Sequence, residues 1–200
     1  MPAALSRRGV AAGRTAHATE RPTPMQTLIR EFRRGDEPAL RAVFESAIHE
    51  VAIRDYTQAQ VDAWAPRDFD ATLWAKRVQG IAPFVVERDG EIVAYADVQA
   101  SGYIDHFFVG ARAGKQGVGG MLMRRIHERA HELDIAVLTS EVSRTAQPFY
   151  VHFGFEIVER HVKEVRGVGI EYAAMRKVLR GQGAQETGFR GPSRGVAEGS

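Results

Sequence analysis

The stretch "GKQGVGGMLMRRI", residues 114–126, places four glycines within seven residues and then continues as an amphipathic helical pattern. Because glycine has no Cβ, a backbone of this kind can approach an anion closely, and the free N–H groups at a helix start point toward it. The helix dipole adds roughly half a positive charge at the same end. The pattern predicts a phosphate site, with a pyrophosphate as its natural ligand. A flexible turn that caps the helix is the alternative.

Two familiar glycine-rich phosphate loops do not fit this stretch. A dinucleotide-binding fingerprint that starts at Gly117 needs a glycine where the chain has Leu122. A Walker loop that ends at Lys115 needs its first glycine where Val109 stands. The glycines therefore indicate another kind of phosphate site.

Length and composition indicate one soluble globular domain. The chain has 200 residues and is 44% hydrophobic, enough for a single core. It has no cysteine, which excludes disulfides, thiolate metal ligands and a cysteine nucleophile and is typical of a reducing compartment. No apolar run approaches about 18 residues, so we expect no membrane span. A cytoplasmic location is the resulting expectation.

The sequence pI of about 9.1 could suggest nucleic-acid binding, but the positive charge lies near the ends of the chain. The formal net charge of +2 contains +3 from residues 1–24 and +1 from residues 180–200, which leaves −2 for the part between them. A folded part without basic excess does not attract phosphate backbones. We therefore expect no nucleic-acid partner.

The two ends of the chain differ in composition from the middle. Residues 1–24 are rich in Ala, Arg, Gly, Thr and Pro without hydrophobic periodicity, which predicts a disordered extension. Residues 180–200 are Gly-rich and polar, which predicts a disordered tail. One domain is therefore expected over residues 25–179.

Helical and strand patterns alternate along that domain. Strands are predicted at 27–32, 83–88, 91–100, 101–110, 135–142, 155–165 and 169–179, with a tight turn at Asp89-Gly90. Helices are predicted at 36–54, 57–66, 68–80, 117–133 and 145–154, the first of them capped by Asp36. This order predicts an α+β domain whose central sheet is mixed, mostly antiparallel and flanked by helices.

Two motifs together resemble the GNAT superfamily of N-acetyltransferases. The stretch 107–130 resembles the family's coenzyme A signature, R/Q-x-x-G-x-G/A after a strand, with Gly117 and Gly119 in place but Gly114 at the Arg/Gln position. The stretch "AQPFYVHFGF", residues 146–155, resembles the family's A-x-x-F-Y-x-x-x-G-F. Two motifs in this order are more specific than either alone. Residues 54–70 and 166–177 further resemble a YafP-like subgroup of bacterial GNAT enzymes.

The resemblance implies a three-layer α/β GNAT fold with a V-shaped splay between the fourth and fifth strands. It also implies acetyl-CoA as co-substrate and direct attack of a primary amine on its thioester, with Tyr150 as the acid that protonates the leaving sulfur. Backbone amides near Phe108 and Val109 would stabilise the oxyanion. The implied cofactor-binding residues are Phe108, Val109, Gly114, Lys115, Gln116, Gly117, Val118, Gly119, Gly120 and Ser143.

The general base is not fixed by the sequence. Asp105 and His106 are candidates, but neighbours on one strand alternate between its faces, so at most one points into the cleft. Glu141, Asp97 and a water relay are alternatives.

The acceptor pocket should come from the helices before residue 83, the part that varies most within the superfamily. His49, Glu50, Tyr56 and Trp64 are candidates there, and they fit equally well as ordinary helix-surface and core residues. The acceptor is expected to be a small molecule or a peptide amine, and a homodimer is a further expectation.

Two alternatives to an acetyltransferase compete. Residues 127–131 satisfy H-E-x-x-H, the signature of a zinc hydrolase. However, the apolar face of that helix lies opposite His127 and His131, so both are expected in solvent, and no metal site is predicted. A non-catalytic acyl-CoA-binding module is the other alternative, which the presence of Tyr150 argues against.

Overall fold

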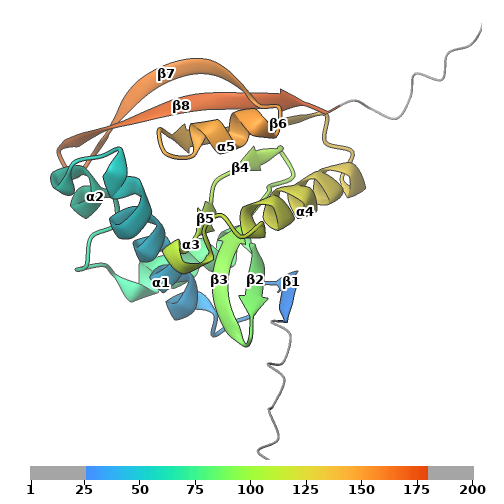
Figure 1. Ribbon diagram of the computed structural model, residues 1–200, viewed down its shortest axis with the longest axis horizontal. Helices are drawn as coiled ribbons and strands as arrows, with labels where there is room; N and C mark the ends of the chain where they lie inside the picture. The colour runs from blue at the N-terminus through green and yellow to red at the C-terminus, as the bar shows by residue number, and fades with distance from the viewer. Residues whose placement is uncertain (1–25, 180–200) are drawn as a thin grey trace, which may run out of the picture.

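The computed structural model describes residues 26–179 as an α+β domain (Figure 1). The predictions for residues 1–24 and 180–200 lie outside the described residues. No helix in the described part combines the length and apolar character needed to cross a membrane.

The elements follow one another in an order close to that predicted. The strands are β1 (Thr27–Glu31), β2 (Phe84–Arg88), β3 (Glu91–Ala96), β4 (Tyr103–Ile104), β5 (Phe107–Val109), β6 (Val137–Ser143), β7 (Glu156–Val165) and β8 (Val168–Val178). The helices are α1 (Glu37–Ser46), α2 (Gln58–Trp64), α3 (Ala71–Ile81), α4 (Val118–Glu132) and α5 (Gln147–His152). Short turns of other helical types are η1 (Ala47–Val51), η2 (Ala52–Arg54) and η3 (Ala111–Ala113).

The strands form two four-stranded sheets, in the orders β1-β2-β3-β5 and β4-β6-β8-β7. All neighbours are antiparallel except β4 and β6. The mixed, mostly antiparallel architecture with flanking helices is thus confirmed.

The predicted strand 101–110 is interrupted, which a period-two pattern could not reveal. Its first part, β4, pairs with β6, whereas its second part, β5, pairs with β3. The two sheets therefore separate after Asp105 and His106, and the gap between β5 and β6 is the splay expected between the fourth and fifth predicted strands.

Two cores lie on opposite faces of the sheets. Helix α4 buries Val118, Leu122, Ile126 and Ala130, one residue per turn, against one face. Helices α1 to α3 cover the other face with Leu40, Val61, Val78 and their neighbours. Burying each such Val, Leu or Ile side chain contributes roughly 1.5–3 kcal/mol. The same spacing that predicted the helices therefore also fixes which side of each helix meets the sheets.

The first predicted helix differs from the expectation in two ways. Asp36 does not cap α1 with its side chain. Its carboxylate instead accepts hydrogen bonds from the Arg30 guanidinium and from the N–H of Arg33. The predicted continuous helix 36–54 also changes to a π-helical turn, η1, at residues 47–51. A π turn widens the backbone locally, and such turns are frequent at functional sites.

Candidate active site

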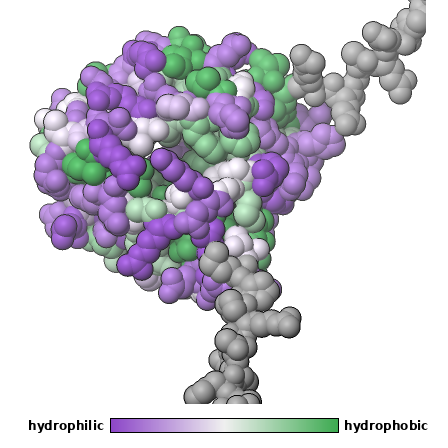
Figure 2. Space-filling view, viewed as in Figure 1, coloured by the Kyte–Doolittle hydropathy of each residue, from purple (hydrophilic) through white to green (hydrophobic). Residues whose placement is uncertain are grey.

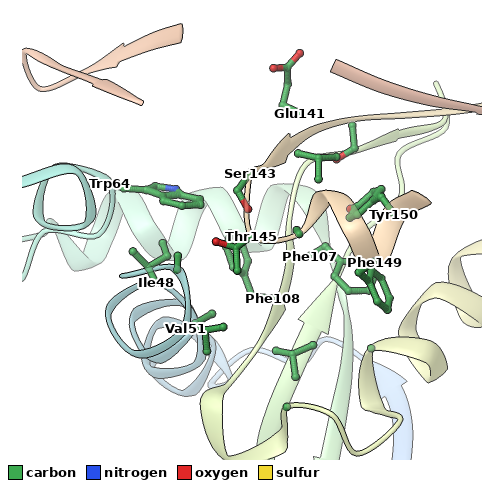
Figure 3. A pocket seen from close by; sticks show the side chains of 18 of the residues that line it. Ile48, Val51, Trp64, Phe107, Phe108, Glu141, Ser143, Thr145, Phe149 and Tyr150 are labelled. Atoms are coloured by element: carbon green, nitrogen blue, oxygen red, sulfur yellow. The ribbon is translucent and has the colours of Figure 1, made fainter. Parts of the chain in front are cut away.

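A cavity of about 280 Å³ opens where the two sheets separate. Its walls come from η1 and α2 on one side, β5 and the start of α4 below, and β6 and α5 on the other side. Figure 3 shows Trp64, Ile48 and Val51 facing Phe149 and Tyr150 across this space. Pale and hydrophobic atoms lie between hydrophilic ridges in the middle of the face shown in Figure 2. The site is therefore a mostly apolar cavity with a few polar groups, the usual composition of a small-molecule site.

One glycine of the turn 114–120, Gly117, has a backbone conformation that favours glycine. Gly117 has φ +80° and immediately precedes α4, in the region that favours glycine. The first N–H groups of a helix have no helical acceptor, and at the start of α4 no side chain caps them either. These free donors and the dipole of a 15-residue helix fit an anion.

Only some of the other residues of the turn line the cavity. Gly114, Lys115 and Gly119 line it. A Cβ on Gly119 would lie 3.2 Å from the Phe149 ring, so this position has no room for a side chain unless the ring moves. Gln116, Gly117, Val118 and Gly120 belong to the turn and the first turn of α4 but are outside the cavity wall. Gly114 has φ −61°, a backbone conformation that any residue adopts, but a Cβ there would lie 3.3 Å from the Ala111 carbonyl oxygen.

The register of β5 determines which of its amides face the splay. The Asp97 N–H donates to the His106 carbonyl, and the Gly110 N–H donates to the Val93 carbonyl. Hydrogen-bonded pairs alternate along antiparallel strands, so the pair between these two is Tyr95 with Phe108. The N–H groups of Phe107 and Val109 consequently point away from β3, across the splay.

This register departs from the sequence expectation at one residue, since the N–H of Phe108 is directed to β3 rather than to the cleft. Phe107, Phe108 and Val109 all line the cavity.

Tyr150 lies on α5 at the wall of the cavity, only 2% exposed. Its ring packs between Phe107, Phe149 and Phe155. Burial raises the pKa of Tyr150 well above its usual value, and the Ser140 hydroxyl opposes this rise in part. The hydroxyl is therefore neutral at physiological pH and can donate a proton or a hydrogen bond into the cavity.

The two candidate bases at the strand break separate in space. Asp105 lines the cavity, and both of its carboxylate oxygens accept hydrogen bonds from Nη2 of Arg77. His106 is outside the cavity wall and 5% exposed, with its ring against Phe44 and Trp74. Burial lowers the pKa of His106 to about 4, against the opposing charge of Asp105. His106 is thus a neutral core residue.

Glu141, one of the alternatives, lies on β6 and lines the cavity. Its Oε2 is 2.6 Å from Nε2 of His161 and 3.4 Å from Nζ of Lys163, both on β7. Ser143, two residues farther along β6, also lines the cavity. Asp97, the other alternative, does not reach the cavity wall.

Of the candidate acceptor residues, Trp64 lines the cavity. His49 binds the Ala65 carbonyl through Nε2 at 2.7 Å. Tyr56 donates to the Glu171 carbonyl at 2.6 Å and accepts from the Arg144 N–H at 2.8 Å. Neither residue lines the cavity: His49 ties η1 to the residue after α2, and Tyr56 ties the chain before α2 to β8 and to the loop after β6. Glu50 is exposed on η1, away from the cavity wall.

The sequence missed two parts of the wall. Ala47, Ile48, Val51 and Ala52 face the cavity from η1 and η2. Their apolar spacing continues that of α1, so no sequence signal marks the change of helix type. Thr145 also lines the cavity, and its hydroxyl donates to Asp55 at 2.7 Å.

The H-E-x-x-H stretch lies on α4, outside the cavity wall. His131 is exposed as expected, but His127 is half-buried, because its Nε2 lies 3.0 Å from Nζ of Lys177 on β8 and its ring packs near Phe153. Within residues 26–179, no three His, Cys, Asp or Glu side chains lie close enough together to hold a metal ion.

Comparison with known proteins identifies the class of enzyme. A family model described as the acetyltransferase (GNAT) domain matches residues 52–179. The protein is therefore an acyltransferase, and the chain belongs to the GNAT acetyltransferase family, whose co-substrate is acetyl-CoA. The resemblance expected from the two motifs is confirmed.

Individual relatives agree with this placement. The N-acetyltransferase YafP of Escherichia coli (strain K12) is 29% identical over 139 residues, which cover 70% of this chain and 87% of YafP. A GCN5-related N-acetyltransferase of Rhodopseudomonas palustris has the same fold, with a TM-score of 0.73 and 24% identity over 76% of this chain and 95% of its own. An acetyltransferase of Salmonella typhimurium, solved with its cofactor acetyl-CoA, has a TM-score of 0.57 and 17% identity over 81% and 99% of the two chains.

Proposed function

We propose that the protein transfers the acetyl group of acetyl-CoA to a primary amine by direct attack of the amine on the thioester. The observation that carries this proposal is the uncapped start of α4 beside a splay that opens onto a cavity with Tyr150 in its wall. Acetyl-CoA supplies the activated acetyl group, and the protein supplies binding groups, donors and a proton path.

The turn 114–120 would hold the pyrophosphate through the first N–H groups of α4, since these lack side-chain and helical acceptors. The Phe107 and Val109 amides would hold the pantetheine arm and stabilise the oxyanion, because β5 leaves them unpaired by β3. The Tyr150 hydroxyl would donate its proton to the departing sulfur, and its neutral state at physiological pH suits that task.

Glu141 is the better candidate for the base that takes the proton of the acceptor amine. Both oxygens of Asp105 accept from Arg77, whereas the two contacts of Glu141 are made with Oε2. His106 is not proposed for this step, because it lies in the core rather than at the cavity wall. Comparing Glu141→Gln with Asp105→Asn by kcat over pH distinguishes the two carboxylates.

Trp64 and the apolar wall of η1 would receive the body of the acceptor, which supports an amine with an apolar portion. Which amine is accepted follows from a screen of small amines, peptides and protein lysines with acetyl-CoA, read as release of the free thiol.

Calorimetric titration with acetyl-CoA tests the cofactor site directly. We expect binding that Gly117→Val abolishes, because a β-branched residue does not adopt φ +80°. Absence of binding to the wild-type protein would refute the proposal. Binding without turnover of any amine would instead favour a non-catalytic acyl-CoA-binding module.

A further inference from the structure

Asp97, the residue that follows β3, lies beside the strand break with its side chain inside the protein, 1% exposed. Its Oδ1 accepts hydrogen bonds from two consecutive backbone N–H groups, those of His106 at 2.6 Å and Asp105 at 3.1 Å. Its own N–H donates to the His106 carbonyl at 3.0 Å. The residue that follows β3 therefore binds the N–H and carbonyl of His106 and also the N–H of the residue before it, Asp105.

This arrangement accounts for the change of strand partner. In a continuous strand, successive N–H groups point to opposite sides, so one acceptor cannot bind two in a row. With both N–H groups turned toward Oδ1, the chain must leave the regular pleat at Asp105 and His106. The residues before the break pair with β6, and those after it pair with β3.

Burying the Asp97 side chain beside the break is unfavourable in itself. Its other oxygen, Oδ2, has no hydrogen-bond partner among residues 26–179. Burial raises the pKa of Asp97 to about 7, although the hydrogen bond from the His106 N–H acts to lower it. A buried polar atom without a partner is unfavourable, so the contacts of Oδ1 must offset it.

A second residue holds the side chains of the same break. Arg77 of α3 donates from Nε to Nε2 of His106 at 2.9 Å and from Nη2 to Asp105. The His106 ring is thereby kept in the core, its Nδ1 3.2 Å from the Tyr95 hydroxyl, while Asp105 faces the cavity. The backbone of the break is fixed from β3 and its side chains from α3.

We propose that Asp97 is a positioning residue of the active site. By binding two consecutive N–H groups, it holds the break that opens the splay and leaves the Phe107 and Val109 amides free to bind acetyl-CoA. The link to acetyl-CoA rests on the proposed function, whereas the holding of the break does not.

Three variants test this role. Asp97→Ala removes the acceptor, and Asp97→Asn keeps a carbonyl oxygen that can bind both N–H groups. Asp70→Ala is the matched control, because Asp70 Oδ1 also accepts two backbone N–H groups, those of Thr72 and Leu73, at the start of α3 and outside the cavity wall.

Two readouts are combined: hydrogen exchange of the Asp105, His106 and Phe108 amides, which are hydrogen-bonded to Asp97 or β3, and calorimetric affinity for acetyl-CoA. In Asp97→Ala we expect exchange at the break to be at least about 10-fold faster and the Kd for acetyl-CoA to rise by roughly 10-fold or more. Asp97→Asn should stay within about threefold of the wild type in both readouts, and Asp70→Ala should keep the wild-type Kd.

Wild-type exchange at Asp105, His106 and Phe108 together with wild-type affinity in a folded Asp97→Ala protein would overturn the proposal. An Asp97→Asn protein with exchange and affinity as impaired as those of Asp97→Ala would overturn it as well. If Asp97→Ala does not fold, faster exchange and weaker binding in Asp97→Asn overturn it in the same way. If the wild type binds no acetyl-CoA, the proposed function fails, and hydrogen exchange alone still decides whether Asp97 holds the break.

Discussion

The buried Asp97 side chain should change how the free energy of unfolding depends on pH, and Asp97→Asn should remove that change. Burial raises the pKa of Asp97 from an ordinary 3.8 to about 7 in the folded protein. Between these values the folded state keeps a proton that the unfolded state has lost. The free energy of unfolding gained from Asp97 is thus fully present below about pH 4 and is lost as the pH rises through 7.

The magnitude follows from the size of the shift. A difference of about three pH units, at about 1.4 kcal/mol each, gives up to about 4 kcal/mol. His106 acts in the opposite direction, because burial lowers its pKa from 6.5 to about 4, so its contribution grows with pH over nearly the same window. The wild-type profile should therefore be nearly flat in this window, apart from the other titrating groups that both proteins share.

Asp97→Asn keeps the contribution of His106 and loses that of Asp97. Relative to the wild type, its free energy of unfolding should rise by several kcal/mol between about pH 4 and pH 7. Urea unfolding followed by the fluorescence of Trp64 and Trp74 measures this at several pH values in that window. A stability difference between the two proteins that stays constant across the window would refute the assignment of a buried, protonated Asp97.

Further predictions concern the cavity. Tyr150→Phe should lower kcat by roughly 10–1000-fold with acetyl-CoA affinity within about twofold, and an unchanged kcat in a chemistry-limited assay would remove Tyr150 from the mechanism. Gly119→Val should weaken acetyl-CoA binding by about 10-fold or more in calorimetry, because its Cβ meets the Phe149 ring at 3.2 Å. Gly114→Arg fits a φ of −61° and adds a cation to the turn, although the Ala111 carbonyl, 3.3 Å from the new Cβ, must shift by a few tenths of an ångström; acetyl-CoA should then bind several-fold more tightly at low salt, a gain that 0.5 M salt reduces. Trp64→Ala should raise the KM of the acceptor found by screening, by roughly 10-fold, while the KM of acetyl-CoA stays the same.

The features that could be read from sequence are those built from neighbouring residues. The turn 114–120, α4 and the α5 motif each lie within about 15 consecutive residues, so glycine spacing and helical period suffice to predict them. The position of Tyr150 at the cavity wall follows from the same local pattern once the family is known.

The features that could not be read depend on which distant residues meet. Asp105 and His106 look like two positions of one strand, yet their environments differ because Asp97 and Arg77 bind them from other elements. The same holds for Glu141, whose partner His161 lies 20 residues farther along the chain on β7.

The sequence by itself therefore determined the class of fold, the order of its elements, the glycine turn and the candidate acid. Tertiary structure alone decided where the strand breaks, which carboxylates reach the cavity, and that Trp64 and the apolar residues of η1, rather than His49 and Tyr56, form its wall. The physical reason is that local conformation follows from backbone freedom and periodicity over a few residues. Burial, strand partners and the hydrogen bonds of a break are instead set by contacts between residues far apart in the chain.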